Sequence, residues 1–170
     1  LSEKGKFRPM GINRNSVLEL TQLRPYVPAE IRAVEWLAFG SNAFNAFVPF
    51  YANIENTPEY FANTTELVTT ESFYWANRIA GALADAQFGS CSSHIERYQA
   101  ALPIEAGRVI HEYDKKFADG KIGKKQVVKL LEEANEKISQ IAKKQTYELI
   151  NNVLYEVSCA MKNGFSRSDS

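Results

Sequence analysis

The sequence has 170 residues, of which 45% are hydrophobic and 24% charged; these proportions are those of a globular chain and exclude intrinsic disorder. The 20 lysine and arginine residues balance 20 aspartate and glutamate residues, so the formal net charge is zero. A neutral chain has no overall field that draws it to nucleic acid or to an anionic membrane, and we expect neither as a partner. The chain has no apolar run of membrane-spanning length and nothing that resembles a signal peptide. We therefore expect a cytoplasmic protein, with Cys91 and Cys159 as reduced thiols.

The first third of the sequence predicts strands. Residues 1–15 are charged and interrupted by glycine and proline, which indicates an irregular lead-in. Alternating residues from Ser16 to Leu23 predict a strand, and two prolines make residues 24–30 a connection. The runs Ile31–Phe39 and Phe47–Ile54 are short, apolar and separated by a Gly-Ser-Asn turn, which is typical of a hairpin. Three strands with short links predict an antiparallel meander.

Both runs of the hairpin are apolar on both faces. Glu35 is the one residue that interrupts the first run. Strands of this kind are covered on both faces in folded proteins, so we expect other parts of the structure above and below the hairpin.

The period of the apolar residues changes to that of a helix after Ser72. Residues 56–65 are polar and predict a loop, and the hydroxyls of residues 69–72 are suited to cap a helix from Phe73 to Phe88. The Gly-Ser-rich residues 89–93 predict a stop or a sharp kink.

Two more helical stretches follow before the last helix. Residues 95–102 have helical spacing, Pro103 predicts a new bend or a helix start, and residues 104–117 form the next stretch. Residues 119–124 predict a turn. From there to Ala160 an apolar stripe recurs at three- and four-residue steps, which predicts one long amphipathic helix with Cys159 in the core.

The order of elements predicts an α+β fold, with strands first and a helix-rich second half. We expect a single unit over residues 1–170. It comprises sheet strands at 16–54, a helical cover at 72–162 and a flexible tail at 163–170.

The most suggestive local cluster is Cys91-Ser92-Ser93-His94, because a thiol and an imidazole three residues apart on a helix can form a nucleophile and its base. The alternative is a structural role, with Cys91 as a small residue at a helix junction, and we favour this interpretation. Catalytic pairs are usually close in space and distant in sequence, and a third group that would orient the imidazole is not evident.

Two other groups of residues invite a functional interpretation. His94 and His111, with Asp85, Glu112 or Asp114, contain metal-binding side chains, but their spacing matches no zinc or calcium pattern, so we expect no metal or other cofactor. Aromatic residues can line a substrate pocket, although at strand and helix spacing they are more often core. The aromatic residues in question are Trp36, Phe73, Tyr74 and Trp75.

Several segments resemble, in the right order, the later part of a bacterial family of cysteine dipeptidases related to penicillin V acylase. The similarity covers roughly Arg8 to Asp114. The segments that carry it are Gln22–Pro25, Pro28, Val34–Leu37, Val48–Ile54, Thr57–Phe61, Phe73–Arg78 and Leu83–Ala86. Several separate matches are more specific than one motif.

The resemblance implies an N-terminal-nucleophile hydrolase, with two stacked antiparallel sheets between helical layers and dipeptides as substrates. In that family a cysteine at the start of the mature enzyme is the nucleophile, and its own α-amino group is the base. The first residue here is Leu1, and Cys91 and Cys159 have ordinary peptide nitrogens. We therefore carry over no catalytic residue. The partner that we expect is the missing N-terminal catalytic portion, which would supply the opposing sheet, and a homo-oligomer is an open alternative.

Three hypotheses follow for the function of the chain. The first is a C-terminal, structural segment of a dipeptidase, inactive alone. The second is a self-contained interaction module that docks through its amphipathic last helix. The third is a small cysteine hydrolase that uses Cys91 and His94.

Overall fold

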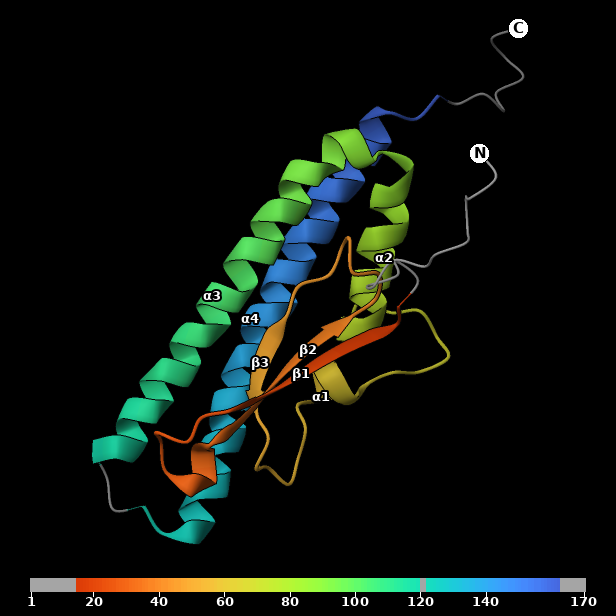
Figure 1. Cartoon of the computed structure of the whole chain (residues 1–170). Helices are drawn as coiled ribbons and strands as arrows, with labels where there is room; N and C mark the ends of the chain where they lie inside the picture. The colour runs from red at the N-terminus through yellow and green to blue at the C-terminus, as the bar shows by residue number, and fades with distance from the viewer. Residues whose placement is uncertain (1–14, 120–121, 163–170) are drawn as a thin grey trace, which may run out of the picture.

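A computed structural model of the chain describes residues 15–119 and 122–162 (Figure 1). Its elements are strands β1 (Val17–Leu23), β2 (Ala33–Phe39) and β3 (Val48–Tyr51), a 3-10 helix η1 (Ala29–Ile31), and helices α1 (Glu59–Ala62), α2 (Phe73–Ala86), α3 (Phe88–Asp119) and α4 (Lys124–Cys159). Strands followed by helices confirm the α+β class. The predicted lead-in lies outside the described residues except for residue 15, and so does the predicted tail. Among the described helices, none is long and apolar enough to cross a membrane.

The three strands form one antiparallel sheet in the order β1-β2-β3, which confirms the predicted meander. The hairpin strands are shorter than the two apolar runs, because Ile31 belongs to η1 and β3 ends at Tyr51. Gly40 ends β2 with a φ of 85°, a left-handed conformation that favours glycine. The chain then passes over α2 before it returns as β3.

Strand β3 is buried along its whole length. On one face, the side chain of Tyr51 reaches α3, where its hydroxyl lies 2.9 Å from the carbonyl oxygen of Ile110. On the other face, Phe50 packs edge-to-face against Phe61 of α1 with ring centroids 4.5 Å apart, and Phe61 contacts Phe73 of α2. The prediction of cover on both faces is therefore confirmed for β3.

The free edge of β3 is closed by α4. The side chain of Asn135, which is completely buried, accepts a hydrogen bond from the N–H of Tyr51 at 2.9 Å and donates one to its carbonyl oxygen at 3.0 Å. A side-chain amide has one acceptor and one donor group side by side, as a neighbouring strand would have. Asn135 thus satisfies backbone groups that would otherwise be buried without partners.

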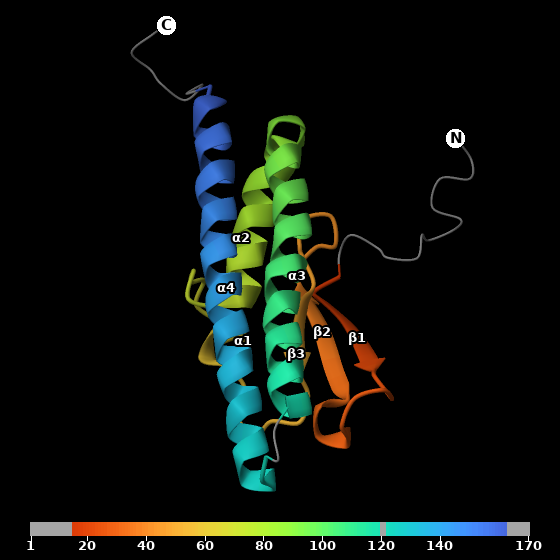
Figure 2. The ribbon, with the colours of Figure 1, turned by 90° about the vertical axis from the view of Figure 1, so that its left-hand side faces the viewer.

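Strand β1, which precedes the two runs of the predicted hairpin, is not covered in the same way. Leu20 and Leu23 are 58% and 69% exposed. Figure 2 shows why: β1 is the outermost strand, on the side of the sheet away from α3 and α4. The helices bury β3 and only part of β2. The sheet meets the helical layer with its β3 edge, so the strands farther from that edge have fewer helices beside them.

Helix α2 begins where the sequence predicts. The side-chain oxygen of Ser72 accepts a hydrogen bond from the N–H of Trp75, as an N-terminal cap does. The break after this helix comes at Gln87, whose φ of −136° is not helical. The predicted stop or kink at residues 89–93 is wrong, since these residues are already inside α3.

Helix α3 also continues through Pro103, where the sequence predicted a new bend or start. Proline costs a helix one backbone hydrogen bond and a steric contact. Apolar residues of α3 are buried both before and after Pro103, and their burial outweighs this cost. One continuous helix keeps all of them on a single face against the core. The buried residues of that face are Ile95, Tyr98, Leu102, Ala106, Val109, Tyr113 and Phe117.

The long last helix is confirmed as α4. It runs antiparallel to α3 along most of its length, and α2 packs against the same pair (Figure 2). The short helix α1 falls within residues 56–65, which the sequence predicted as loop. Tyr60 and Phe61 are both buried, so the burial of these two rings on the sheet and α2 fixes a helical turn there.

We predict that Asn135→Ala lowers the free energy of unfolding by about 3 kcal/mol, because two backbone groups of Tyr51 lose their partners inside the core. Asn151→Ala, at an exposed position of the same helix, is the matched control and should change stability by less than about 0.5 kcal/mol. Urea unfolding measures both. Equal effects of the two substitutions would contradict the role given to Asn135.

Candidate functional site

Cys91 and His94 lie one turn apart near the start of α3, but the structure does not pair them. Cys91 is completely buried in the core. His94 faces α4 instead, where its Nε2 atom lies 3.5 Å from a carboxylate oxygen of Glu156. Within the described part of the chain, no hydrogen bond joins the thiol to the imidazole. A buried thiol without a base is an inert core residue, so the structure does not favour a hydrolase that uses these two residues.

Cys159 is exposed, and its predicted place in the core is wrong. It lies two positions after Val157, and a step of two positions is a rotation of about 200° around a helix. Val157 packs against the core, so Cys159 faces the opposite side.

Three of the five side chains that suggested a metal site have other partners; the ion pair of His94 with Glu156 is given above. Asp114 is bound by Arg24, and Glu112 forms an ion pair with Lys116 at 2.8 Å. Within residues 15–119 and 122–162, no three His, Cys, Asp or Glu side chains lie close enough together to hold a metal ion.

The four aromatic residues do not share a pocket. Phe73 is buried among the rings of one face of the sheet, whereas Trp36 points from the opposite face, beside the side chain of Gln22. Trp75 donates its indole N–H to the carbonyl oxygen of Thr65 at 2.7 Å, and Tyr74 packs on Trp75 and Phe39. The expectation of a core role is thus fulfilled by Phe73, while the other three lie partly exposed around the sheet.

A buried ionic cluster joins the end of β1 to α3 and β3. The guanidinium of Arg24 donates to the two carboxylate oxygens of Asp114 at 2.5 and 3.2 Å and also to the carbonyl oxygen of Ile31. Tyr51 places its hydroxyl 2.9 Å from Asp114. Burial, and then the hydrogen bond to Asp114, raise the pKa of Tyr51 well above its ordinary range, so it stays a neutral donor.

Sequence reasoning missed this cluster. Arg24 stands between two predicted elements and was assigned to a connection, and Asp114 is 90 residues away. An arginine in a proline-rich connection is an ordinary surface residue unless the fold buries it, and Arg24 is only 5% exposed. The spacing of apolar residues around Arg24 and around Asp114 does not indicate that the two side chains meet.

The face of the sheet that contains Phe50 also has a pair of carboxyl groups. Glu35 of β2 lies diagonally across from Glu19 of β1, because Glu35 is opposite Thr21 and Glu19 is opposite Leu37. A hydrogen bond with Glu19, followed by burial and by the charge of Glu19, raises the pKa of Glu35. A hollow of about 260 Å³ opens on the same face, between Glu35, Phe50 and Phe61.

A larger hollow, of about 340 Å³, lies where the β2–β3 connection crosses α2. Its lining combines one cation, Arg78, and one anion, Asp85, with the ring of Phe44. Neither hollow contains a cysteine, a serine–histidine pair or a cluster of metal-binding groups. The described residues can bind and position a ligand, but they hold no nucleophile with an adjacent base.

Comparison with protein families places the chain in a class of peptide hydrolases. The model of peptidase family C69 matches residues 1–101. This covers more than half of the chain, so the chain belongs to peptidase family C69.

Similar proteins agree with this family. A dipeptidase of Bifidobacterium longum is 37% identical over 199 aligned residues, which cover 96% of this chain and 37% of the relative. A probable dipeptidase A of Streptococcus pyogenes is 37% identical over 98% of this chain and 34% of the relative. Dipeptidase A of Lactobacillus helveticus is 34% identical over 91% of this chain. The chain thus spans about a third of the length of the curated relatives it matches.

We predict that Arg24→Met destabilises the fold by about 2–3 kcal/mol, because it leaves the half-buried carboxylate of Asp114 without its cation. The double substitution Arg24→Met with Asp114→Leu should recover part of this loss, since it removes both charges. Arg32→Met, at a nearby exposed arginine, is the matched control. Thermal and urea unfolding measure these effects, and a double variant as unstable as the single one would argue against the ion pair.

We predict that Glu35→Gln raises stability at pH 7 by about 0.3 kcal/mol, because it removes the repulsion between two ionised carboxylates. The folded state binds the proton of Glu35 more tightly than the unfolded state does, so the stability of the wild type falls as pH rises from about 4.3 through the raised folded-state pKa. The gain in the variant should disappear below that range. Urea unfolding at pH 4 and pH 7 tests this, with exposed Glu66→Gln as the control.

Proposed function

We propose that this chain is part of a dipeptidase of the cysteine type. The observation that carries the proposal is the similarity, over more than nine-tenths of the chain, to proteins that are named dipeptidases. It is supported by the match to a peptidase family over residues 1–101. The cytoplasm is the proposed compartment, because both Cys91 and Cys159 are free thiols and disulfides are rare there.

In the proposed reaction the nucleophile is an N-terminal cysteine outside these 170 residues, and its α-amino group is the base. The thiolate attacks the carbonyl carbon of the dipeptide, the carbon–nitrogen bond breaks, and the amine leaves with a proton. Water then hydrolyses the thioester and regenerates the thiol. The burial of Cys91 and the lack of a base beside it support a nucleophile from elsewhere.

The proposed role of this chain is structural. It contributes three strands and the helices that pack on them, and further strands of the enzyme would pair with β1. Exposed apolar residues support this part of the proposal, since Val17, Leu20 and Leu23 are each more than half exposed on an outer strand. Exposed apolar edge strands promote aggregation unless something covers or pairs with them.

The alternative of an interaction module that docks through α4 has less support. The apolar stripe of this helix is already buried against α2 and α3, and Leu131, Ile138 and Val153 are completely inaccessible. The large apolar residues of α4 that remain exposed within the described range are Tyr147, Leu154 and Tyr155, which do not form a continuous stripe along the helix.

The experiment compares the longest polypeptide that carries this sequence with the 170-residue chain, in an assay of dipeptide hydrolysis with and without a thiol-alkylating agent. We expect hydrolysis only by the longer polypeptide, and we expect alkylation to abolish it, because the proposed nucleophile is a thiol outside the chain.

The controls remove the two cysteines of this chain. The longer polypeptide with Cys91→Ala and Cys159→Ser should hydrolyse dipeptides and remain sensitive to alkylation. Hydrolysis by the 170-residue chain, lost on Cys91→Ala, would instead support the hydrolase that uses Cys91 and His94.

A further inference from the structure

One face of the sheet has a hollow with an apolar floor and an acidic rim. The hollow, of about 260 Å³, lies beside β3, and the buried rings of Phe50 and Phe61 form its floor. Leu37 and Ile54, both half-buried, extend the apolar lining. Among the described residues of the lining, Glu35 alone carries a charge. The hollow therefore combines an apolar wall with a single carboxyl group.

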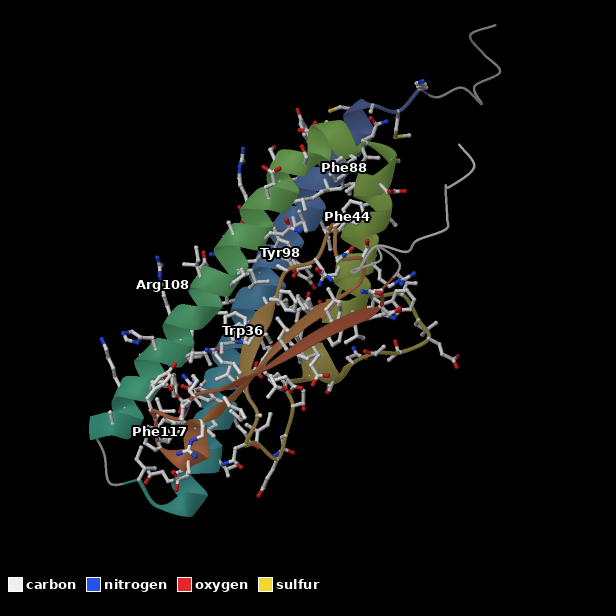
Figure 3. All side chains as sticks on the ribbon, viewed as in Figure 1. Trp36, Phe44, Phe88, Tyr98, Arg108 and Phe117 are labelled. Carbon is white, nitrogen blue, oxygen red and sulfur yellow. The ribbon has the colours of Figure 1, made fainter. Side chains whose placement is uncertain are left out.

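A second carboxyl group lies at the rim of this hollow. The register of β1 and β2 places exposed Glu19 diagonally across from Glu35, on the same face of the sheet. The hydrogen bond between the two is the largest cause of the raised pKa of Glu35. Trp36, the next residue of β2, points from the opposite face, on the side of α3 that Tyr51 also reaches (Figure 3). The two carboxyl groups are thus close together on one face, and a single cation between them is within reach of both.

These two carboxyl groups have no cation beside them. Within residues 15–119 and 122–162, no ion pair involves Glu19 or Glu35, and no lysine or arginine is among the causes of the shifted pKa. Basic residues of neighbouring elements are used elsewhere, since Arg24 and Lys143 form ion pairs of their own. Arg108 points away from the body of the protein (Figure 3). The described residues therefore supply no counter-ion for the rim.

The sheet around the hollow is uncovered on the same face. Val17 and Leu23 alternate with Glu19 along β1, so they share its face, and they are 51% and 69% exposed. Apolar side chains gathered on an uncovered face are typical of a surface that another polypeptide covers. The chain spans about a third of the length of the curated relatives it matches, so the rest of such an enzyme is long enough to cover this face.

We propose that the part of the enzyme outside these 170 residues covers this face and inserts a lysine side chain into the hollow. The source of the lysine rests on the proposed function, in which the chain is one segment of a longer enzyme. Its methylene stem lies along Phe50, Phe61 and Ile54, and its ammonium group binds the carboxylates of Glu35 and Glu19. An ammonium group has three donors on one atom and serves carboxylates from two strands, whereas the planar fork of a guanidinium matches a single carboxylate.

The test treats the longest polypeptide that carries this sequence with a water-soluble carbodiimide. The reagent joins a carboxyl group to an adjacent amine as an amide and takes up the water that is lost, so it links only groups already in contact. We expect mass spectrometry of the digest to find Glu35 or Glu19 linked to a lysine outside the 170 residues. With added glycinamide as a competing amine, Glu35 should react about tenfold more slowly than exposed Glu96 of α3, because its ion pair has to open first.

The sign of a stability change is a second readout. In the 170-residue chain, Glu35→Gln relieves the repulsion from Glu19 and should raise the urea concentration at the midpoint of unfolding. In the longer polypeptide the same substitution removes an ion pair, so the midpoint should fall instead. Glu96→Gln, at an exposed position of α3, is the matched control and should leave the midpoint unchanged in both. A rise of the midpoint on Glu35→Gln in the longer polypeptide as well would contradict the proposed cation.

Three results of the labelling experiment would overturn the proposal. Equal reaction of Glu35 and Glu96 with glycinamide would show that the face is open, and a link to a lysine within the 170 residues would show that the cation has another source. Protection of Glu35 without a link to any lysine would show that a different group covers it.

Hydrolysis of alanyl-alanine is measured separately, on the unmodified polypeptide. Hydrolysis together with an unprotected Glu35 would leave the dipeptidase proposal standing and remove this one. A link from Glu35 to an outside lysine in a polypeptide that hydrolyses no dipeptide would do the reverse.

Discussion

The side-chain amide of Asn135 holds the edge of β3 as a neighbouring strand would, and the rest of the fold is arranged around this contact. Because α4 closes the edge, the two faces of β3 remain for α3 and for the aromatic residues of α1 and α2. The sheet therefore enters the helical layer edge-on. This explains both why β3 is completely buried and why β1, two strands away, is not.

The charged pairs of the sheet affect stability more strongly where they are more deeply buried. Arg24 is buried and Asp114 half-buried, and their other hydrogen bonds go to Ile31 and Tyr51; Nε of Arg24 is the buried atom of the pair without a partner. Such a pair fixes the end of β1 against α3, since separation of the two would leave a buried charge without a partner. Glu19 is exposed and Glu35 is only half-buried, so water weakens the repulsion between their carboxyl groups.

The family of the chain and its structure bear on different parts of the proposed function. Membership of peptidase family C69 supports the proposal of peptide hydrolysis, whereas the described cysteines have no base beside them. An outer strand with exposed apolar side chains is consistent with a chain that spans about a third of the length of its relatives.

Local sequence patterns were enough to predict the class of fold, the meander, the cap at Ser72 and the long last helix, because these depend on periodicity and on turn and cap residues. It also carried the family resemblance, through segments that match in order. Tertiary packing decided the rest. It continued α3 through Pro103, turned Cys159 outward and left β1 exposed. It also brought Arg24 to Asp114, since contacts between residues 90 positions apart leave no trace in the period of either segment.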